Sequence, residues 1–424
     1  MIGYQLRRLR RLRGLTQEEL ADRANVSRDL VAKLEQGRRH TARITSLTSL
    51  ARALDVELSD LVKRAAAALE AEDGDAADSV ALRNALTSLA PGLGAATAAS
   101  ERAPRRPAGF DDLVATLVHR GAAPPVETPI DLAALTRGAA SAKRNLQACR
   151  YALTVGELAR LLCVSSMRAQ EIDGDGALRL WALRAHACQT AAGVLLKLGH
   201  NGLAFIAATR SMESAERSQD PLVIGSSARI LAHAFLSGGH AREARTTVTS
   251  AAARLDGLDR THQQRSVLGS LLLRGAVAAA RDGDRCGALA LLDEADAIAR
   301  SLGEDHNYRW TAFGPTNVVL HRVHVAVTVG DAGTALEHLR RIDASRLAVV
   351  ERRACLYIDA ACALVQLDKH ADACHMLAAA ERLAPEELTS RASVRALIGG
   401  MARSAPRSLQ PTVRALAVRA GADL

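Results

Sequence analysis

Apolar residues recur at intervals of three and four along most of this chain, which is the period of amphipathic helices. Near the N-terminus the pattern is divided into short stripes, with turn-forming residues between them. A first stripe of leucines runs from Leu6 to Leu12 and ends at Gly14. A fourth stripe covers residues 44–54 and a fifth begins at residue 57. The pattern therefore predicts a small five-helix domain within residues 1–66.

The second and third of these helices are joined by a very short connection. Thr16 and Glu19 form a capping box that begins a helix over residues 17–24. Asn25 tolerates the left-handed backbone that a tight turn needs, and Ser27 then caps the next helix. Two short helices at this distance form a helix-turn-helix, whose second helix enters the major groove of duplex DNA.

The rest of the chain has a different pattern. Residues 67–129 are rich in Ala, Pro and Gly and are expected to be a linker, with short helices over 79–90 and 110–120. From residue 130 to 424, long apolar helices alternate with Gly or Asp turns, and similar turn positions recur 40, 44, 47 and 38 residues apart. This period predicts an all-α solenoid of helix pairs. The recurring turn positions are His200, His240, Asp284, Asp331 and Lys369.

Composition narrows the class of protein. The formal charge is +9, and residues 1–65 contribute +6 of it through 14 basic and 8 acidic residues. Positive charge is thus concentrated where the DNA motif lies. We find no apolar signal segment and no membrane-length apolar run, so we expect a cytoplasmic, nucleoid-associated protein. The seven scattered cysteines are expected to be reduced residues, mostly in the core.

The N-terminal 60 residues resemble the DNA-binding domains of phage repressors and Cro-type regulators of the XRE family. The helix pairs that follow resemble tetratricopeptide repeats. The whole layout, including the FGPTNV and ERLAPEEL segments, resembles actinobacterial regulators that combine both parts, and it is similar to the peptide-sensing regulators of Gram-positive bacteria. The positions that carry the repressor resemblance are Gln17, Ala21, Val26, Ser27, Leu34, Glu35, Gly37 and the LARALDV run.

The resemblance implies roles in DNA binding. Gln17 would meet a phosphate at the N-terminus of its helix. Ser27, Arg28 and Asp29 open the recognition helix, and Arg28 would contact either guanine or a phosphate. Asp29 would accept from cytosine, hold Arg28, or lie outside the groove. Further along, Lys33 would face phosphates or a second base. Backbone contacts are expected from Arg38, Arg39 and Arg43, with a narrow minor groove as the alternative contact of Arg43. An internal salt bridge is expected from Arg10 and Glu35.

A polar stripe interrupts one apolar helix of the repeats. Asn317, His321 and His324 are spaced i, i+4 and i+7, so they share one helix face. One interpretation is the wall of a ligand groove, in which Asn grips a peptide backbone. The other is a satisfied polar network between helices. Candidates for the same groove on preceding helices are Arg274, Arg229 and His233.

Two functions are compatible with these observations. The first is a transcriptional regulator, dimeric on an inverted repeat, whose repeats sense a peptide or small ligand. The second is an adaptor whose repeats hold a protein such as a sigma or anti-sigma factor. An enzyme is not expected, because phosphate-loop, nucleophile-elbow and zinc-protease motifs are absent. We expect no cofactor and no metal, and interpret His370, Cys374 and His375 as core or surface residues.

Overall fold

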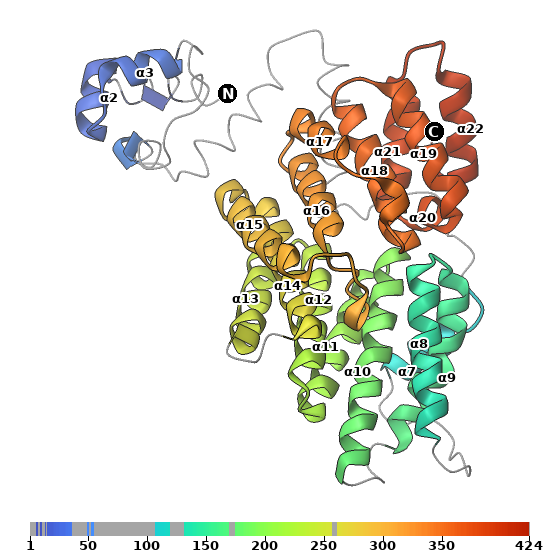
Figure 1. The fold of residues 1–424 in the computed structure, drawn as a ribbon. Coiled ribbons are helices and arrows are strands. Elements are labelled where there is room, and N and C mark those ends of the chain that lie inside the picture. The colour runs from blue at the N-terminus through green and yellow to red at the C-terminus, as the bar shows by residue number, and fades with distance from the viewer. Residues whose placement is uncertain are drawn as a thin grey trace. The chain divides into compact units, whose positions relative to one another are not determined.

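The computed structural model describes residues 6, 9–10, 13, 15–35, 49–50, 52–54, 107–118, 131–168, 174–256 and 261–423. The chain divides into two compact units, Met1–Val80 and Ala81–Leu424. Across these described ranges, helices are the only regular secondary structure (Figure 1). This confirms the expected all-α fold.

The first unit contains the helix-turn-helix. Helix α2 (Gln17–Ala24) begins with the predicted capping box, since the Thr16 side chain accepts from the Glu19 N–H group and the Glu19 carboxylate accepts from Thr16 N. Asn25 ends α2 in the left-handed conformation, at φ 50° and ψ 49°. Helix α3 (Arg28–Glu35) follows at once. The expected first, fourth and fifth helices lie largely outside the described residues.

Leucine and alanine side chains make the core of this unit. The inner faces of α2 and α3 meet the leucines that flank them in sequence, which is the packing that the apolar stripes predicted. Its buried residues are Leu6, Leu9, Leu15, Leu20, Ala21, Ala24, Val31, Leu34, Leu50 and Leu54.

The second unit is built from successive helix pairs, in which neighbouring helices pack side by side. Three further helices, α20 (Pro385–Ser390), α21 (Ala392–Ser404) and α22 (Gln410–Ala420), follow the pairs. The pairs are α8 (Leu132–Gln147) with α9 (Tyr151–Arg168), α10 (Gly174–Lys197) with α11 (Asn201–Ser218), α12 (Pro221–Ser237) with α13 (Ala241–Asp256), α14 (His262–Arg281) with α15 (Arg285–Leu302), α16 (Pro315–Thr328) with α17 (Ala332–Leu339), and α18 (Val350–Gln366) with α19 (His370–Leu383).

The recurring turn positions lie directly before α11, α13, α15, α17 and α19, the second helices of the last five pairs, as predicted. Asp284 and Asp331 cap α15 and α17 through their carboxylates, which accept from the N–H groups of Gly287 and Thr334. The fourth residue after each turn position is a fully buried alanine, whose small side chain lets the two helices approach closely. These alanines are Ala204, Ala244, Ala288, Ala335 and Ala373.

Helix α7 (Phe110–Val118) lies in the segment expected to be a linker, where a short helix was predicted. It packs against α9 and α11. Its buried residues Phe110, Leu113 and Leu117 belong to the same hydrophobic cluster as the first two helix pairs. This helix is therefore an integral part of the core of the second unit.

The connection between α15 and α16 departs from the regular repeat. It contains the short 3-10 helix η2 (Tyr308–Trp310), in which Arg309 and Trp310 have positive φ angles of 50° and 61°. Its end places Phe313 fully buried against Gly269 of α14. A Cβ atom at Gly269 would lie 2.0 Å from Phe313 Cζ, so only glycine leaves room for the ring.

The last helix pair packs against the first. Ala354 of α18 and Ala384, which precedes α20, belong to the hydrophobic cluster of α8, α9, α10 and α11. Figure 1 shows α20 beside the ends of α8 and α10. The first helices of distant repeats are consequently brought to one region.

Candidate functional site

The N-terminal end of α3 presents polar side chains to solvent. Ser27 caps the helix by accepting from the Leu30 N–H group at 3.2 Å. Arg28 and Asp29, the next two residues, are both exposed. The Asp29 carboxylate lies 2.7 Å from Lys33 Nζ, one helical turn later. Asp29 is thus paired with Lys33 in the free protein, and Arg28 extends from the helix end where base contacts are made in such motifs.

A buried carboxylate holds the helix-turn-helix together. The Glu35 side chain is 2% exposed, and it accepts from Arg10 Nε at 2.7 Å and Arg10 Nη2 at 2.9 Å. It also accepts from Gln17 Nε2 at 2.7 Å. The predicted Arg10–Glu35 salt bridge is confirmed. The Gln17 amide, expected to meet a phosphate, is bound to Glu35 in the free structure.

The remaining predicted DNA contacts, Arg38, Arg39 and Arg43, lie outside the described residues. Their roles stay predictions from the resemblance. Within the part of the first unit that is described, the exposed basic side chains on α3 are Arg28 and Lys33.

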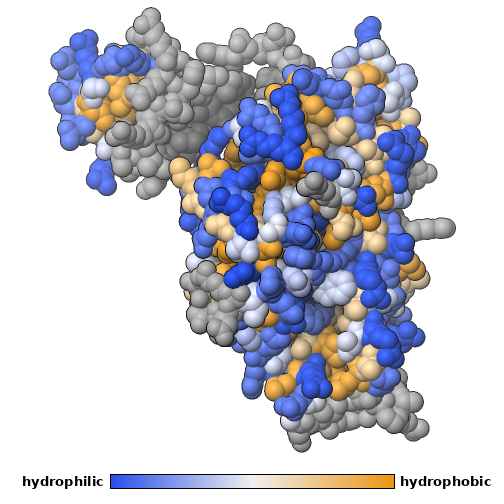
Figure 2. All heavy atoms as spheres, viewed as in Figure 1, coloured by the Kyte–Doolittle hydropathy of each residue, from blue (hydrophilic) through white to orange (hydrophobic). Residues whose placement is uncertain are grey.

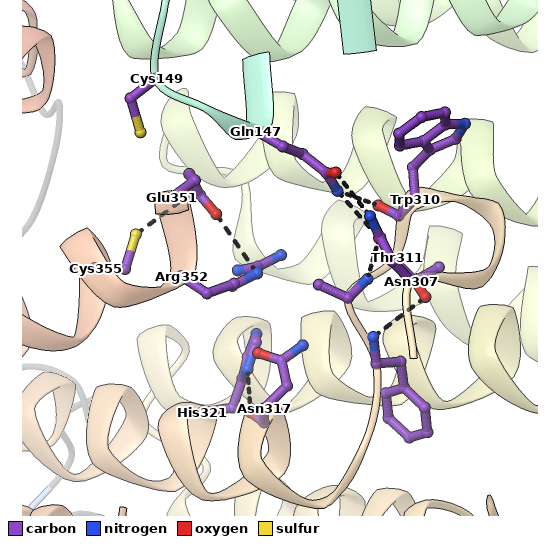
Figure 3. A network of polar contacts seen from close by, with 12 residues as sticks. Gln147, Cys149, Asn307, Trp310, Thr311, Asn317, His321, Glu351, Arg352 and Cys355 are labelled. Atoms are coloured by element: carbon purple, nitrogen blue, oxygen red, sulfur yellow. Dashed lines mark hydrogen bonds and ion pairs between the residues drawn. The ribbon is translucent and has the colours of Figure 1, made fainter. Parts of the chain in front are cut away.

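The polar stripe on α16 separates into two kinds of residue. His324 Nδ1 lies 3.1 Å from the Asp359 carboxylate of α18, so His324 belongs to a satisfied contact between helices. Asn317 and His321 are 2% and 7% exposed. His321 Nδ1 donates to the Asn317 carbonyl at 2.9 Å, whereas the Asn317 side-chain oxygen has no partner among the described residues (Figure 3). Burial, the main cause, holds the pKa of His321 well below its ordinary value.

The other predicted groove candidates lie on α12 and α14. The Nε atoms of Arg229 and Arg274 are buried and lack a hydrogen-bond partner in the described structure. Burial first, and then the charge of neighbouring arginines, lowers the pKa of Arg229 to about 10 and that of Arg274 to about 9. Burial and Arg274 lower the pKa of His233 well below its ordinary value. Arg229, Arg274 and His233 are therefore close enough to affect one another's pKa values.

Two further cations belong to this region, and sequence analysis missed both. Lys143 of α8 is 8% exposed, and burial together with Arg229 lowers the pKa of its amine to about 7. Arg352 of α18 lowers the pKa values of Arg229 and His321. We call Lys143, Arg229, Arg274 and Arg352 the interior cation cluster. Charged residues within apolar helices were the sequence signal that could have indicated these two cations. Only the packing of the helices shows which charged residues lie near one another.

A buried ion network lies beside this cluster. Lys197 Nζ, at the end of α10, is 2.7 Å from Glu351 Oε1 and 2.6 Å from Glu387 Oε1. Glu387 also accepts from Arg391 Nη1 at 3.0 Å and from Tyr151 Oη at 2.5 Å. Burial by itself would raise the pKa of Glu387, but Lys197 and Arg391 outweigh it and hold that pKa below its ordinary value.

The side chains of Glu351, Cys355 and Glu387 are close enough to coordinate a cation, since their ligand atoms lie within 4.8 Å of one another. The ammonium group of Lys197 already takes that place, because it contacts both carboxylates. His370, considered from sequence as part of a metal cluster, instead bonds the Asp368 carbonyl and the Ser404 hydroxyl.

The connection between α15 and α16 bridges to the first repeats. Asn307 Nδ2 donates to Gln147 Oε1 of α8 at 2.8 Å, and Gln147 Nε2 donates to the Trp310 carbonyl at 3.3 Å (Figure 3). Arg309 Nη2 donates to the Asp220 carboxylate before α12 at 2.6 Å. The polar contacts of this connection therefore link three repeats.

On the face seen in Figure 2, hydrophilic residues cover most of the repeats, with smaller hydrophobic areas between them.

Solved structures that are similar to this chain include PlcR and a Rap protein. The crystal structure of Bacillus thuringiensis PlcR in complex with the peptide PapR7 and DNA is 12% identical, with a TM-score of 0.35, over 89% of this chain and 98% of PlcR. A Rap protein complexed with competence and sporulation factor is 12% identical, with a TM-score of 0.47, over 91% of this chain and 99% of Rap. At these scores the similarity identifies neither a ligand nor a partner for this chain.

The described helices include none that is both long and apolar enough to span a membrane.

Comparison with protein families gives a specific result for the N-terminal unit. Residues 6–61 match the family described as helix-turn-helix. An uncharacterized HTH-type transcriptional regulator of Sinorhizobium fredii, y4dJ, is 45% identical over 62 residues, which are 15% of this chain and 79% of that protein. Through this domain, in which α2 and α3 form the motif, the chain belongs to the helix-turn-helix family of DNA-binding transcriptional regulators.

Proposed function

We propose that this protein is a sequence-specific transcriptional regulator that binds a short inverted repeat as a homodimer, and that its repeat domain senses a peptide or small ligand. The observation that carries the DNA part is the arrangement at α3. Its N-terminal end exposes Arg28, while its C-terminal end is held by the buried Glu35 side chain.

This arrangement supports a mechanism of base readout. Helix α3 lies in the major groove, and the Arg28 guanidinium donates two parallel hydrogen bonds to O6 and N7 of guanine. Glu35 fixes the angle between α3 and the start of α2 by binding Arg10 and Gln17 at once. The N-terminus of α2 then approaches a phosphate. Lys33 exchanges its Asp29 partner for the DNA backbone.

The dimer follows from the size of one reading head. A single helix-turn-helix reads only a half-site, so two heads one helical turn apart on the duplex are needed for an operator of useful length. The repeats supply the surface for pairing two chains. An inverted repeat is the operator that matches a twofold dimer.

Unpaired groups inside the repeats support ligand sensing. The side-chain oxygen of Asn317 and the Nε atoms of Arg229 and Arg274 are buried without a partner within the described part of the chain. Buried polar groups are normally hydrogen-bonded, so a water molecule or a bound ligand would complete the bonding of these atoms.

A DNase footprint of the full chain on the DNA upstream of its own gene tests this function, across a salt series. We expect a protected inverted repeat, affinity that falls steeply with salt, and a loss of about 1–3 kcal/mol in Arg28→Ala with relaxed preference at one base position. Arg23→Ala, which removes an exposed arginine of α2, is the matched control.

Two results would contradict the proposal. An unchanged base preference in Arg28→Ala would contradict the assignment of Arg28 to base readout. Absence of any specific protection, combined with recovery of a stoichiometric protein partner on the repeats, would favour the adaptor function, in which DNA binding is secondary.

A further inference from the structure

The connection between α15 and α16 forms a loop that is closed at its base. The His306 N–H group donates to the Phe313 carbonyl at 3.1 Å, and the Asp305 carboxylate accepts from the Thr316 N–H group at 3.0 Å. Phe313 is fully buried against α14. Residues 307–312 therefore project as a unit from an anchored base.

The tip of this loop, residues 307–310, reaches back to two earlier parts of the chain. Asn307 and Gln147 of α8 exchange hydrogen bonds between their side-chain amides at 2.8 and 3.2 Å (Figure 3). Arg309 Nη2 donates to the Asp220 carboxylate, before α12, at 2.6 Å. The helices α8, α10, α12 and α14 pack against one another in this order. A loop that is anchored on α14 and bonds α8 therefore bridges across α12 and α10.

The tip contacts can be lost without loss of the helices that they join. Asp220 Oδ1 accepts from the Leu222 N–H group and caps α12, whereas Arg309 binds the other oxygen of this carboxylate. Gln147 is the last residue of α8, and backbone hydrogen bonds of Ala148 close that helix end. The Arg309 and Asp220 side chains are 23% and 35% exposed, so their ion pair contributes little to stability.

The backbone of the closed loop opposes these contacts. Arg309, Trp310 and Ala312 have φ angles of 50°, 61° and 50°. This left-handed region is unfavourable for residues that carry a Cβ atom, and such conformations persist only where the surroundings hold them. The bonds to Gln147 and Asp220 supply part of this restraint. Their loss would let the three residues relax, so backbone strain offsets part of the stability that the contacts contribute.

We propose that residues 307–312 are a releasable latch across the first helices of the repeats. In the closed position the tip bonds Gln147 and Asp220, and in the open position it leaves both while Phe313 stays buried. Opening frees these two polar side chains and uncovers the helix face that the loop bridges. The latch goes beyond the proposed function and does not depend on it, because both positions belong to the free chain.

Hydrogen exchange of the full chain, measured by mass spectrometry on peptides that cover residues 307–313, tests the latch. Amides of a tip that opens locally exchange before the repeats unfold. We expect them to exchange at least about tenfold faster than the amides in the middle of α14. The rate should hardly change in dilute urea, because local opening exposes little surface.

The first variant weakens the closed position. Gln147→Met keeps the length of the side chain but removes its hydrogen bonds to Asn307 and to the Trp310 carbonyl. We expect exchange of the tip to accelerate by about fivefold. Gln366→Met is the matched control, because its amide donates to the Val327 carbonyl away from the loop, and it should leave the tip unchanged.

The second variant stabilises the closed position. Ala312→Gly relieves the left-handed backbone and keeps the backbone N–H group that donates to Asn307 Oδ1. We expect exchange of the tip to slow by about fivefold. Ala405→Gly is the matched control, because Ala405 has a φ angle of −66° and glycine relieves nothing there.

Two kinds of result would overturn the latch. Exchange of the tip that is as slow as that of α14, with the same dependence on urea, would show that the loop opens only when the repeats unfold. A tip whose exchange is unchanged in Gln147→Met or in Ala312→Gly would show that these contacts or this backbone do not control opening. Asn307→Ala removes the amide contact from the side of the loop, and it replaces Gln147→Met if that variant fails to fold.

Discussion

The ammonium group of Lys197, at the end of α10, lies 2.6 Å from the carboxylate of Glu387 in α20, 190 residues further along the chain. The Glu387 side chain has no solvent exposure and that of Lys197 has 13%. Tyr151 and Arg391 bind the same carboxylate. This contact joins the second helix pair to the end of the array.

Breaking this contact should destabilise the second unit strongly. Lys197→Met leaves Glu387 buried beside one fewer cation, and we expect the free energy of unfolding to fall by about 3–5 kcal/mol. Urea unfolding measures it. Arg254→Met is the control, because its pair with Glu216 is about half exposed on both sides and should contribute at most about 1 kcal/mol. Similar losses in the two variants would contradict a dominant role for the buried network.

Lys143 should make stability depend on pH above neutrality. Burial, followed by Arg229, lowers the pKa of the folded amine to about 7, whereas the unfolded value is about 10.4. The unfolded chain therefore binds more protons between these values, and stability should rise with pH by on the order of 1.4 kcal/mol per unit. The measurement is urea unfolding at pH 7, 8 and 9.

Lys143→Met should be more stable than the natural chain at pH 7, and its stability should rise less with pH. Lys369→Met, which removes an exposed lysine, should keep the natural slope. Parallel pH profiles for Lys143→Met and the natural chain would show that this amine is not the titrating group.

Two acidic residues of α3 should differ sharply in their contribution to the stability of the DNA-binding unit. Glu35→Ala removes the acceptor of Arg10 and Gln17 and leaves a nearly buried arginine uncompensated, so we expect a loss of about 3 kcal/mol or more. Asp29→Ala breaks only the exposed pair with Lys33 and should cost about 0.5 kcal/mol or less. Circular dichroism of the two variants during heating gives the comparison. Equal melting would refute the assigned role of Glu35.

Gly269→Ala should disturb the connection before α16. The added Cβ would meet the Phe313 ring at 2.0 Å, and such overpacking costs about 1–3 kcal/mol or more. Gly202→Ala is the control, because its Cβ meets nothing within 4 Å, and in a helix it should be neutral or slightly stabilising. Adding Phe313→Leu to Gly269→Ala should restore part of the stability. Loss without such rescue would place the clash elsewhere.

Local sequence patterns were sufficient to predict the helices and the helix-turn-helix motif. The capping box at Thr16 and Glu19, the left-handed Asn25 and the turns before the second helices depend on residues a few positions apart, and the structure confirms them. The Arg10–Glu35 salt bridge could be predicted from the family resemblance, because both residues lie within this small domain. The family assignment of residues 6–61 followed from the same positions.

The sequence by itself thus determined an all-α chain, a helix-turn-helix and an array of helix pairs, because caps, turns and apolar periods are local. Only the tertiary structure decided that His324 pairs with Asp359, that Lys143 and Arg352 join Arg229 and Arg274, and that Lys197 meets Glu387. These contacts depend on how separate helices pack, and the paired residues lie from 35 to 190 positions apart in the sequence. Since neither spacing nor residue type records that packing, a charged residue inside an apolar helix shows its partner only after the helices have assembled.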